Sequence, residues 1–257
     1  MKTALLLLSL LPMAAFAKDP FEGTWKARVD SFKTTGAPDV FEVKDGSFSC
    51  RSCVPPYTIK ADGTLQKTPE NAYRDSASFK ITGPSSAEWK TQKAGKLIGE
   101  VSLSVSADGK VLTQKGINYV GASPAHFTYT ETRTAAGAAG SHAIAGSWQN
   151  NGLADVSAAA LVTVITATPN GLKYESNGTT VDAKFDGKEY PTQGDPGHTM
   201  VTLKRINDHE IEETDHSDGK LSDVIHWKAS SDGKTLTFVD EDKLHNTTTT
   251  FTEDRVK

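Results

Sequence analysis

The only two cysteines of the chain lie three residues apart, in Cys50-Arg51-Ser52-Cys53. This spacing is compatible with a disulfide, a redox-active pair, or a metal or exposed-thiol role. A redox pair of the thioredoxin type needs its first cysteine at a helix N-terminus, which lowers the pKa of the thiol. Here the flanking sequence is strand-like and two prolines follow. In an exported chain we therefore expect a local disulfide between Cys50 and Cys53, with the other two roles as alternatives.

The histidines are distributed unevenly, and residues 144–257 hold five of the seven: His198, His209, His216, His226 and His245. A zinc or copper site needs three or four ligands that converge on one point. None of these histidines has the i, i+4 or His-x-His spacing of a strong metal motif. We expect histidines in solvated turns, assign no metal ligands and expect no cofactor; cofactor-binding residues are unknown at this stage.

Acid–base catalysis would require carboxylates gathered in a cleft with shifted pKa values. Most Asp and Glu residues lie in Asp-Gly turns or are expected to alternate outward, as in Glu210-Ile211-Glu212-Glu213. The chain has no Gly-x-Ser-x-Gly nucleophile elbow and no glycine-rich phosphate loop. The sequence therefore predicts no catalytic residues and a protein that is not an enzyme.

The first 17 residues have the pattern of a signal peptide. Lys2 precedes an apolar run, and Ala15-Phe16-Ala17 is a small-x-small cleavage signature. The run is shorter than the roughly 20 residues that a membrane-spanning helix needs. We expect cleavage after Ala17, a periplasmic or secreted protein, and no stable insertion in a membrane. The formal net charge of −4 argues against a nucleic-acid partner.

One stretch of the chain occurs twice. Residues 95–113 recur 124 positions later as residues 219–237, with nine of the 19 positions identical. Each copy is typical of a β-hairpin closed by a two-residue Asp-Gly turn, at Asp108-Gly109 and Asp232-Gly233. One face stays apolar in both copies, with Val101, Leu103 and Val105 replaced by Ile225, Trp227 and Ala229. We expect these faces to belong to the core.

Turn signals such as Asp45-Gly46, Asn177-Gly178 and Asp218-Gly219 separate short alternating segments along the whole chain. This spacing, with almost no helical pattern, is typical of an antiparallel sandwich or barrel. We expect an all-β protein of two tandem small antiparallel barrels, residues 18–133 and 144–257. The Ala/Gly-rich residues 134–143 are expected to be the linker between them. One merged sheet is the alternative.

Two further motifs carry a resemblance to a known family. A Gly-x-Trp on the first strand and an arginine on the last strand resemble the lipocalin-like (calycin) superfamily, whose arginine packs across the tryptophan and plugs one end of the barrel. The resemblance implies the following plug residues, which are structural: Gly23, Trp25 and Arg133 in the first unit, and Gly146, Trp148 and Arg255 in the second. The Asp-Gly-Lys-x-Leu-Thr hairpins also resemble exported tandem-repeat proteins of Acidobacteria.

The expected function follows from this barrel architecture. Small barrels are either filled by side chains or just able to hold one ligand. We expect a non-catalytic binding module of two lipocalin-like barrels that holds small apolar ligands. The alternative is an extracytoplasmic structural or protein-interaction module with filled barrels and a protein partner. A barrel hydrolase or isomerase is the least favoured function.

Overall fold

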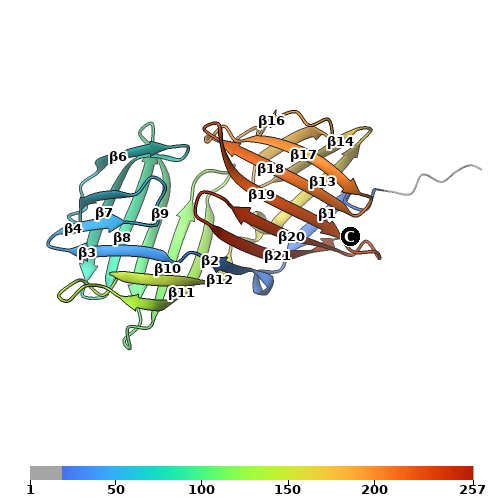
Figure 1. Cartoon of the computed structure of the whole chain (residues 1–257). Helices are drawn as coiled ribbons and strands as arrows, with labels where there is room; N and C mark the ends of the chain where they lie inside the picture. The colour runs from blue at the N-terminus through green and yellow to red at the C-terminus, as the bar shows by residue number, and fades with distance from the viewer. Residues whose placement is uncertain (1–18, 257) are drawn as a thin grey trace, which may run out of the picture.

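A computed structural model describes residues 19–256 of the chain as two antiparallel, barrel-like sheets (Figure 1). The signal peptide expected at residues 1–17 lies outside this range. The helices described are two 3-10 turns, η1 (Val29–Ser31) and η2 (Ala158–Leu161), and in residues 19–256 no helix is long and apolar enough to span a membrane. The expectation of an all-β chain with two barrels is confirmed.

The first barrel has the strand order β5-β4-β3-β12-β11-β10-β9-β8-β7-β6. Its strands are β3 (Asp39–Lys44), β4 (Ser47–Cys50), β5 (Tyr57–Lys60), β6 (Gln66–Asn71), β7 (Arg74–Gly83), β8 (Ser86–Lys93), β9 (Lys96–Val105), β10 (Val111–Asn118), β11 (Ala125–Ala136) and β12 (Gly146–Val156). The sheet curls back on itself between β5 and β7, where Gly63 N donates to Phe79 O at 2.9 Å.

The second barrel has the order β15-β14-β13-β1-β21-β20-β19-β18-β17-β16, and β2 pairs with β21 beside this path. Its strands are β1 (Gly23–Ala27), β2 (Lys33–Gly36), β13 (Val162–Thr168), β14 (Gly171–Ser176), β15 (Thr179–Lys184), β16 (Tyr190–Pro191), β17 (Met200–Asn207), β18 (Glu210–Ser217), β19 (Lys220–Ala229), β20 (Thr235–Asp242) and β21 (Thr247–Val256). Thr180 and Gln193 exchange backbone hydrogen bonds of 3.0 and 2.8 Å that join the two ends of the sheet.

The two units exchange their first strands. β1 opens the first unit but lies between β13 and β21 of the second barrel, while β12 opens the second unit but lies between β3 and β11 of the first. In Figure 1 the blue strand β1 accordingly lies among the orange and red strands. The sheets thus divide the chain differently from the expected boundary at residues 134–143.

The Ala/Gly-rich segment explains this exchange. Residues 134–136 continue β11, and a short loop then returns the chain as β12, antiparallel to β11, with Ala136 opposite Gly146. Ile144 and Ala145 at the end of the loop are buried in the core of the first barrel. Strands that follow one another through a short connection pair readily. The segment is therefore a hairpin loop of the first barrel, and β1 occupies the corresponding position in the second.

The barrels also touch through side chains. Tyr73 of the first barrel donates its hydroxyl to Asp195 of the second at 3.1 Å. Beside this side-chain contact, Ala122 N in the β10–β11 loop of the first barrel donates to Asn177 O in the β14–β15 turn of the second at 3.0 Å. The mouth of the second barrel, where the β20–β21 turn lies, faces the first barrel, because Tyr129 of the first barrel lines a common cavity with Asp242 and His245.

Several expected turns are present in the structure. At Asp45-Gly46, Asn177-Gly178 and Asp218-Gly219 both residues have positive φ, as a two-residue hairpin turn requires. In the repeated hairpin the expectation of a two-residue turn is wrong. The β9–β10 connection spans residues 106–110, and of Asp108 and Gly109 only the glycine has positive φ. The Asp108 carboxylate instead accepts hydrogen bonds from Ser106 Oγ and Lys110 N and holds the longer turn.

The apolar faces of the repeated hairpins lie inside the barrels, as expected. Leu103 and Val105 are buried in the first core, and Trp227 and Ala229 are buried in the second. Period-2 alternation on β9 and β19 therefore points one face of each hairpin into its barrel.

Candidate functional site

The cysteine pair forms the expected disulfide, Cys50–Cys53. It joins the end of β4 to the loop before β5 in the first barrel, and Cys50 packs in the core of that barrel.

The two arginines of the Gly-x-Trp resemblance do lie over tryptophans, but each lies over the tryptophan of the other copy. Arg133 stacks on Trp148 with its guanidinium carbon 3.9 Å from the ring centroid, and Arg255 stacks on Trp25 at 4.1 Å. The sequence grouped Trp25 with Arg133 and Trp148 with Arg255. In the structure, Trp25 instead pairs with Arg255, and Trp148 pairs with Arg133. This follows from the exchange of β1 and β12.

Each arginine also binds three backbone carbonyls. Arg133 donates to the carbonyls of Gly109, Ala143 and Ala145, each at 2.6 Å. A Cβ atom at Gly146 would clash with the Arg133 guanidinium, and one at Gly23 with that of Arg255. The glycine of Gly-x-Trp is thus required by the close approach of the arginine. These six residues pack together at one end of each barrel.

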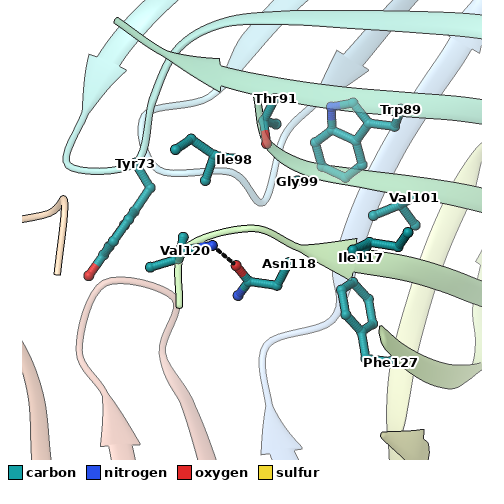
Figure 2. A pocket seen from close by; sticks show the side chains of 10 residues that line it. All are labelled: Tyr73, Trp89, Thr91, Ile98, Gly99, Val101, Ile117, Asn118, Val120 and Phe127. Atoms are coloured by element: carbon teal, nitrogen blue, oxygen red, sulfur yellow. Dashed lines mark hydrogen bonds between the residues drawn. The ribbon is translucent and has the colours of Figure 1, made fainter. Parts of the chain in front are cut away.

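An apolar cavity of about 440 Å³ opens at the other end of the first barrel (Figure 2). Its lining comes mainly from β8, β9 and β10, and includes Trp89, Ile98, Val101, Ile117 and Phe127. Figure 2 shows Tyr73 at one end of the cavity and Trp89 at the other, with Val120 and Phe127 along one side.

Glycines leave part of this space open. Gly116 faces Phe127 across the β10–β11 ladder, and a Cβ at Gly116 would clash with that ring. Gly99 lines the cavity directly, and a Cβ there would make ordinary contact with Thr91 Oγ1 at 3.4 Å. Because Gly99 has no side chain, the cavity is open at this position. The side chain of a larger residue substituted for Gly99 would extend into the cavity.

The equivalent positions of the second barrel carry carboxyl groups. Strands β7 to β10 match β17 to β20 with the same offset of 124 that relates the repeated hairpins. Under this offset Trp89 corresponds to Glu213, Thr91 to Asp215 and Gly116 to Asp240. The duplicated barrels thus differ at these three positions, where the first barrel has Trp, Thr and Gly and the second has carboxyl groups.

The expectation that Glu213 faces solvent is wrong. Its side chain is buried, with 3 % of the residue exposed, and Tyr174 donates its hydroxyl to Glu213 Oε1 at 2.5 Å. Glu131 and Glu253, at equivalent positions of β11 and β21, are also buried. Sequence reasoning could have found Glu213, because a residue two positions after the buried Ile211 must share its face in a regular strand.

Burial changes the ionisation of these carboxyl groups. Removal from water raises the pKa of Glu213 and of Asp215, and their mutual repulsion adds to the effect on Asp215. Burial and the neighbouring Asp223 and Asp242 carboxylates raise the pKa of Asp240 to about 7. The interior of the second barrel therefore favours either neutral carboxyl groups or carboxylates paired with a bound cation.

One carboxylate at this mouth has a structural role. Asp242 accepts hydrogen bonds from the backbone N–H groups of Leu244 and His245, and its Oδ2 lies 2.6 Å from His245 Nδ1. These contacts lower the pKa of the Asp242 carboxyl despite its burial. Both oxygens hold the β20–β21 turn, so Asp242 is not free to act as a general base.

The histidines do not form a cluster. His126, His198 and His226 are exposed, and His216 lies 3.1 Å from Glu189. Within the part of the chain that the structure describes, no group of three or more His, Cys, Asp or Glu residues is arranged to hold a metal ion.

The fold and these interiors define a tandem of two strand-exchanged antiparallel barrels with unlike lumens. Comparison of the chain with protein-family models, with curated proteins and with solved structures finds no match.

Proposed function

We propose that this protein is an exported, non-catalytic binding module whose first barrel holds a small apolar ligand. The observation that carries the proposal is the cavity of about 440 Å³. Ligand pockets are typically roughly 300–1,000 Å³ and lined mainly by apolar and aromatic side chains, and Trp89, Val101 and Phe127 supply such a lining. A filled barrel, as the structural alternative requires, would leave no such space.

The ionisation and the hydrogen bonds of the buried carboxyl groups favour binding over catalysis. Acid–base catalysis commonly pairs a protonated carboxyl group with an ionised one. Asp240 and Asp242 have pKa values shifted in opposite directions, but both oxygens of Asp242 are used by the β20–β21 turn. In the first barrel, the apolar lining of the cavity offers aromatic and aliphatic surface to a ligand.

The proposal is tested by filling the cavity at Gly99. Gly99→Val places two methyl groups in the space now free beside Thr91, on a strand where valine is well tolerated. We expect the variant to bind N-phenyl-1-naphthylamine, an apolar fluorescent probe, at least tenfold more weakly than the wild type in a fluorescence titration.

The matched control is Ser104→Val, which adds valine to the exposed face of the same strand. It should bind the probe as the wild type does. Equal binding by the wild type and Gly99→Val, or no binding by the wild type, would contradict the proposal. Native mass spectrometry of protein purified from its own source then identifies any ligand retained by the wild type.

A further inference from the structure

The apolar cavity of the first barrel ends at a side chain that the second barrel holds. Tyr73, in the turn between β6 and β7, lines the cavity, and Figure 2 shows it at the end opposite Trp89. Its hydroxyl donates to Asp195 Oδ2 at 3.1 Å and lies 3.3 Å from Thr199 Oγ1. Both partners belong to the loop between β16 and β17 of the second barrel. One barrel therefore fixes part of the cavity wall of the other.

The β16–β17 loop fits closely around this tyrosine. The Asp195 carboxylate also accepts hydrogen bonds from Gly197 N at 3.1 Å and Thr199 N at 3.0 Å, so the acceptor of the Tyr73 hydroxyl is itself fixed. A Cβ atom at Gly197 would lie 2.4 Å from Tyr73 Cζ, so the loop can approach the ring only with glycine there. Burial raises the pKa of Tyr73 to about 12, and the hydroxyl therefore stays a donor at neutral pH.

A second contact holds another segment that lines the same cavity. Val120 lines the cavity and belongs to the loop between β10 and β11. In this loop Ala122 N donates to Asn177 O of the β14–β15 turn at 3.0 Å. Gly121 approaches the same turn so closely that a Cβ atom there would lie 2.4 Å from Asn177 O. The second barrel therefore contacts two of the segments that surround the cavity.

We propose that the second barrel controls access to the apolar cavity of the first barrel, with Tyr73 as the positioning residue at the mouth of that cavity. While Asp195 and Thr199 hold the hydroxyl, the ring stays at the end of the cavity and restricts the passage of a ligand. Movement of the β16–β17 loop releases the ring. The cavity then opens toward the junction of the barrels, where Tyr73 also lines a cavity of about 340 Å³. This inference rests on the function proposed for the apolar cavity.

Control of access has a kinetic signature. A side chain that only restricts passage slows binding and release by the same factor, whereas a contact with the bound ligand changes mainly the dissociation rate. Tyr73→Phe separates these roles, because it keeps the ring and removes only the hydroxyl. In stopped-flow fluorescence we expect both rate constants of N-phenyl-1-naphthylamine to rise about threefold or more, with a dissociation constant within about twofold of the wild type. A change in the dissociation rate alone would overturn the proposal.

A thiol inside the cavity measures access without any ligand. The two cysteines of the chain form the Cys50–Cys53 disulfide, so Gly99→Cys introduces a single free thiol at a position that lines the cavity. We expect N-phenylmaleimide to react with this thiol about threefold faster or more when Tyr73→Phe or Asp195→Ala is added, because the released ring clears the mouth. Equal reaction rates with and without these substitutions would overturn the proposal.

Two controls separate access from a general loosening of the fold. Tyr190→Phe removes a tyrosine–aspartate hydrogen bond of the same length, 3.1 Å to Asp186, within the second barrel, and should not change the reaction rate. A thiol at the exposed position of Ser104→Cys should react equally fast with and without Asp195→Ala. If Tyr190→Phe accelerates the reaction as much as Tyr73→Phe, the proposal is overturned. A wild type that does not bind the fluorescent probe contradicts the proposed function, and the reaction rates of the thiol still decide whether the second barrel controls access.

Discussion

At the scale of single residues, the buried glutamates of the last strands make the stability of the folded protein depend on pH. Glu253 is 4 % exposed, and Thr163 donates its hydroxyl to Glu253 Oε1 at 3.1 Å. Burial raises the pKa of the Glu253 carboxyl to about 7. A carboxyl group whose pKa is higher in the folded state stabilises the protein below its unfolded pKa, and this contribution is lost as the pH rises through the folded value.

The substitution Glu253→Gln tests this linkage. The amide oxygen can still accept from Thr163, but the side chain no longer has to ionise inside the barrel. At pH 8 we expect the variant to have a free energy of unfolding about 2–3 kcal/mol higher than the wild type. At pH 4.5 the difference should nearly vanish. Urea denaturation at both pH values measures it.

The control is Glu88→Gln, at an exposed position of β8. It should change the free energy of unfolding by less than about 0.5 kcal/mol at both pH values. A Glu253→Gln variant that is less stable than the wild type at pH 8 would show that the charged carboxylate is required in the folded state.

At the scale of elements, the exchange of β1 and β12 determines which side chains meet. Both strands begin with the same Gly-x-Trp pattern, and both accept an arginine over the tryptophan. The β11–β12 hairpin brings Trp148 beside Arg133 through a short loop, with Arg133 directly opposite Trp148 in the ladder. β1 brings Trp25 beside Arg255 in the same way, although 230 positions separate these two residues in the sequence.

Double-mutant cycles distinguish the crossed pairing from a pairing within each unit. Trp25→Phe combined with Arg255→Lys should show an interaction free energy of about 0.5–2 kcal/mol, because the stacked guanidinium and indole are in contact. Trp25→Phe combined with Arg133→Lys should be additive within about 0.5 kcal/mol. Chemical denaturation of the four proteins in each cycle provides the measurement, and the reverse result would contradict the exchange.

At the scale of the whole molecule, the exchange of strands between the two units holds the two barrels together. The first barrel takes β12 from the second half of the chain, and the second barrel takes β1 and β2 from the first, so neither half contains a complete sheet. Ala122 and Tyr73 add contacts between the barrels outside the ladders. A cut in the loop between β11 and β12 would leave both crossed strands in place.

A protease site inserted between Ala139 and Gly140, which are exposed, tests this arrangement. After cleavage we expect the two fragments to elute together in size-exclusion chromatography under native conditions and to separate only in denaturant. Two barrels without exchange, joined only by a linker, would separate after the cut. The uncut protein carrying the same insertion is the control for its effect on folding.

Much of the architecture could be predicted from the sequence, because it depends on local patterns. Alternation in the repeated hairpins identified the core positions Leu103 and Trp227, and glycines after Asp or Asn identified the two-residue turns. The Cys50–Cys53 pair needs no distant element to form. These features follow from the φ/ψ preferences and side-chain periods of neighbouring residues.

The candidate sites were less predictable because they depend on closure of the barrels. The apolar cavity at Gly99 forms only when β8, β9 and β10 curve around a common interior. The pKa of Asp240 rises because closure removes its carboxyl group from water and brings Asp223 and Asp242 near it. A sequence pattern predicts which face of a strand points into the barrel. It does not predict how completely the side chains on that face fill the interior.

The sequence by itself determined that the chain is all-β, that one unit occurs twice, and that each copy begins with Gly-x-Trp and ends with an arginine strand. Only the tertiary structure decided which copy of the first strand completes which barrel, since both copies carry the same local pattern. The short return loop after β11 resolves that ambiguity by pairing β12 with its neighbour in sequence, which leaves the place in the second barrel to β1.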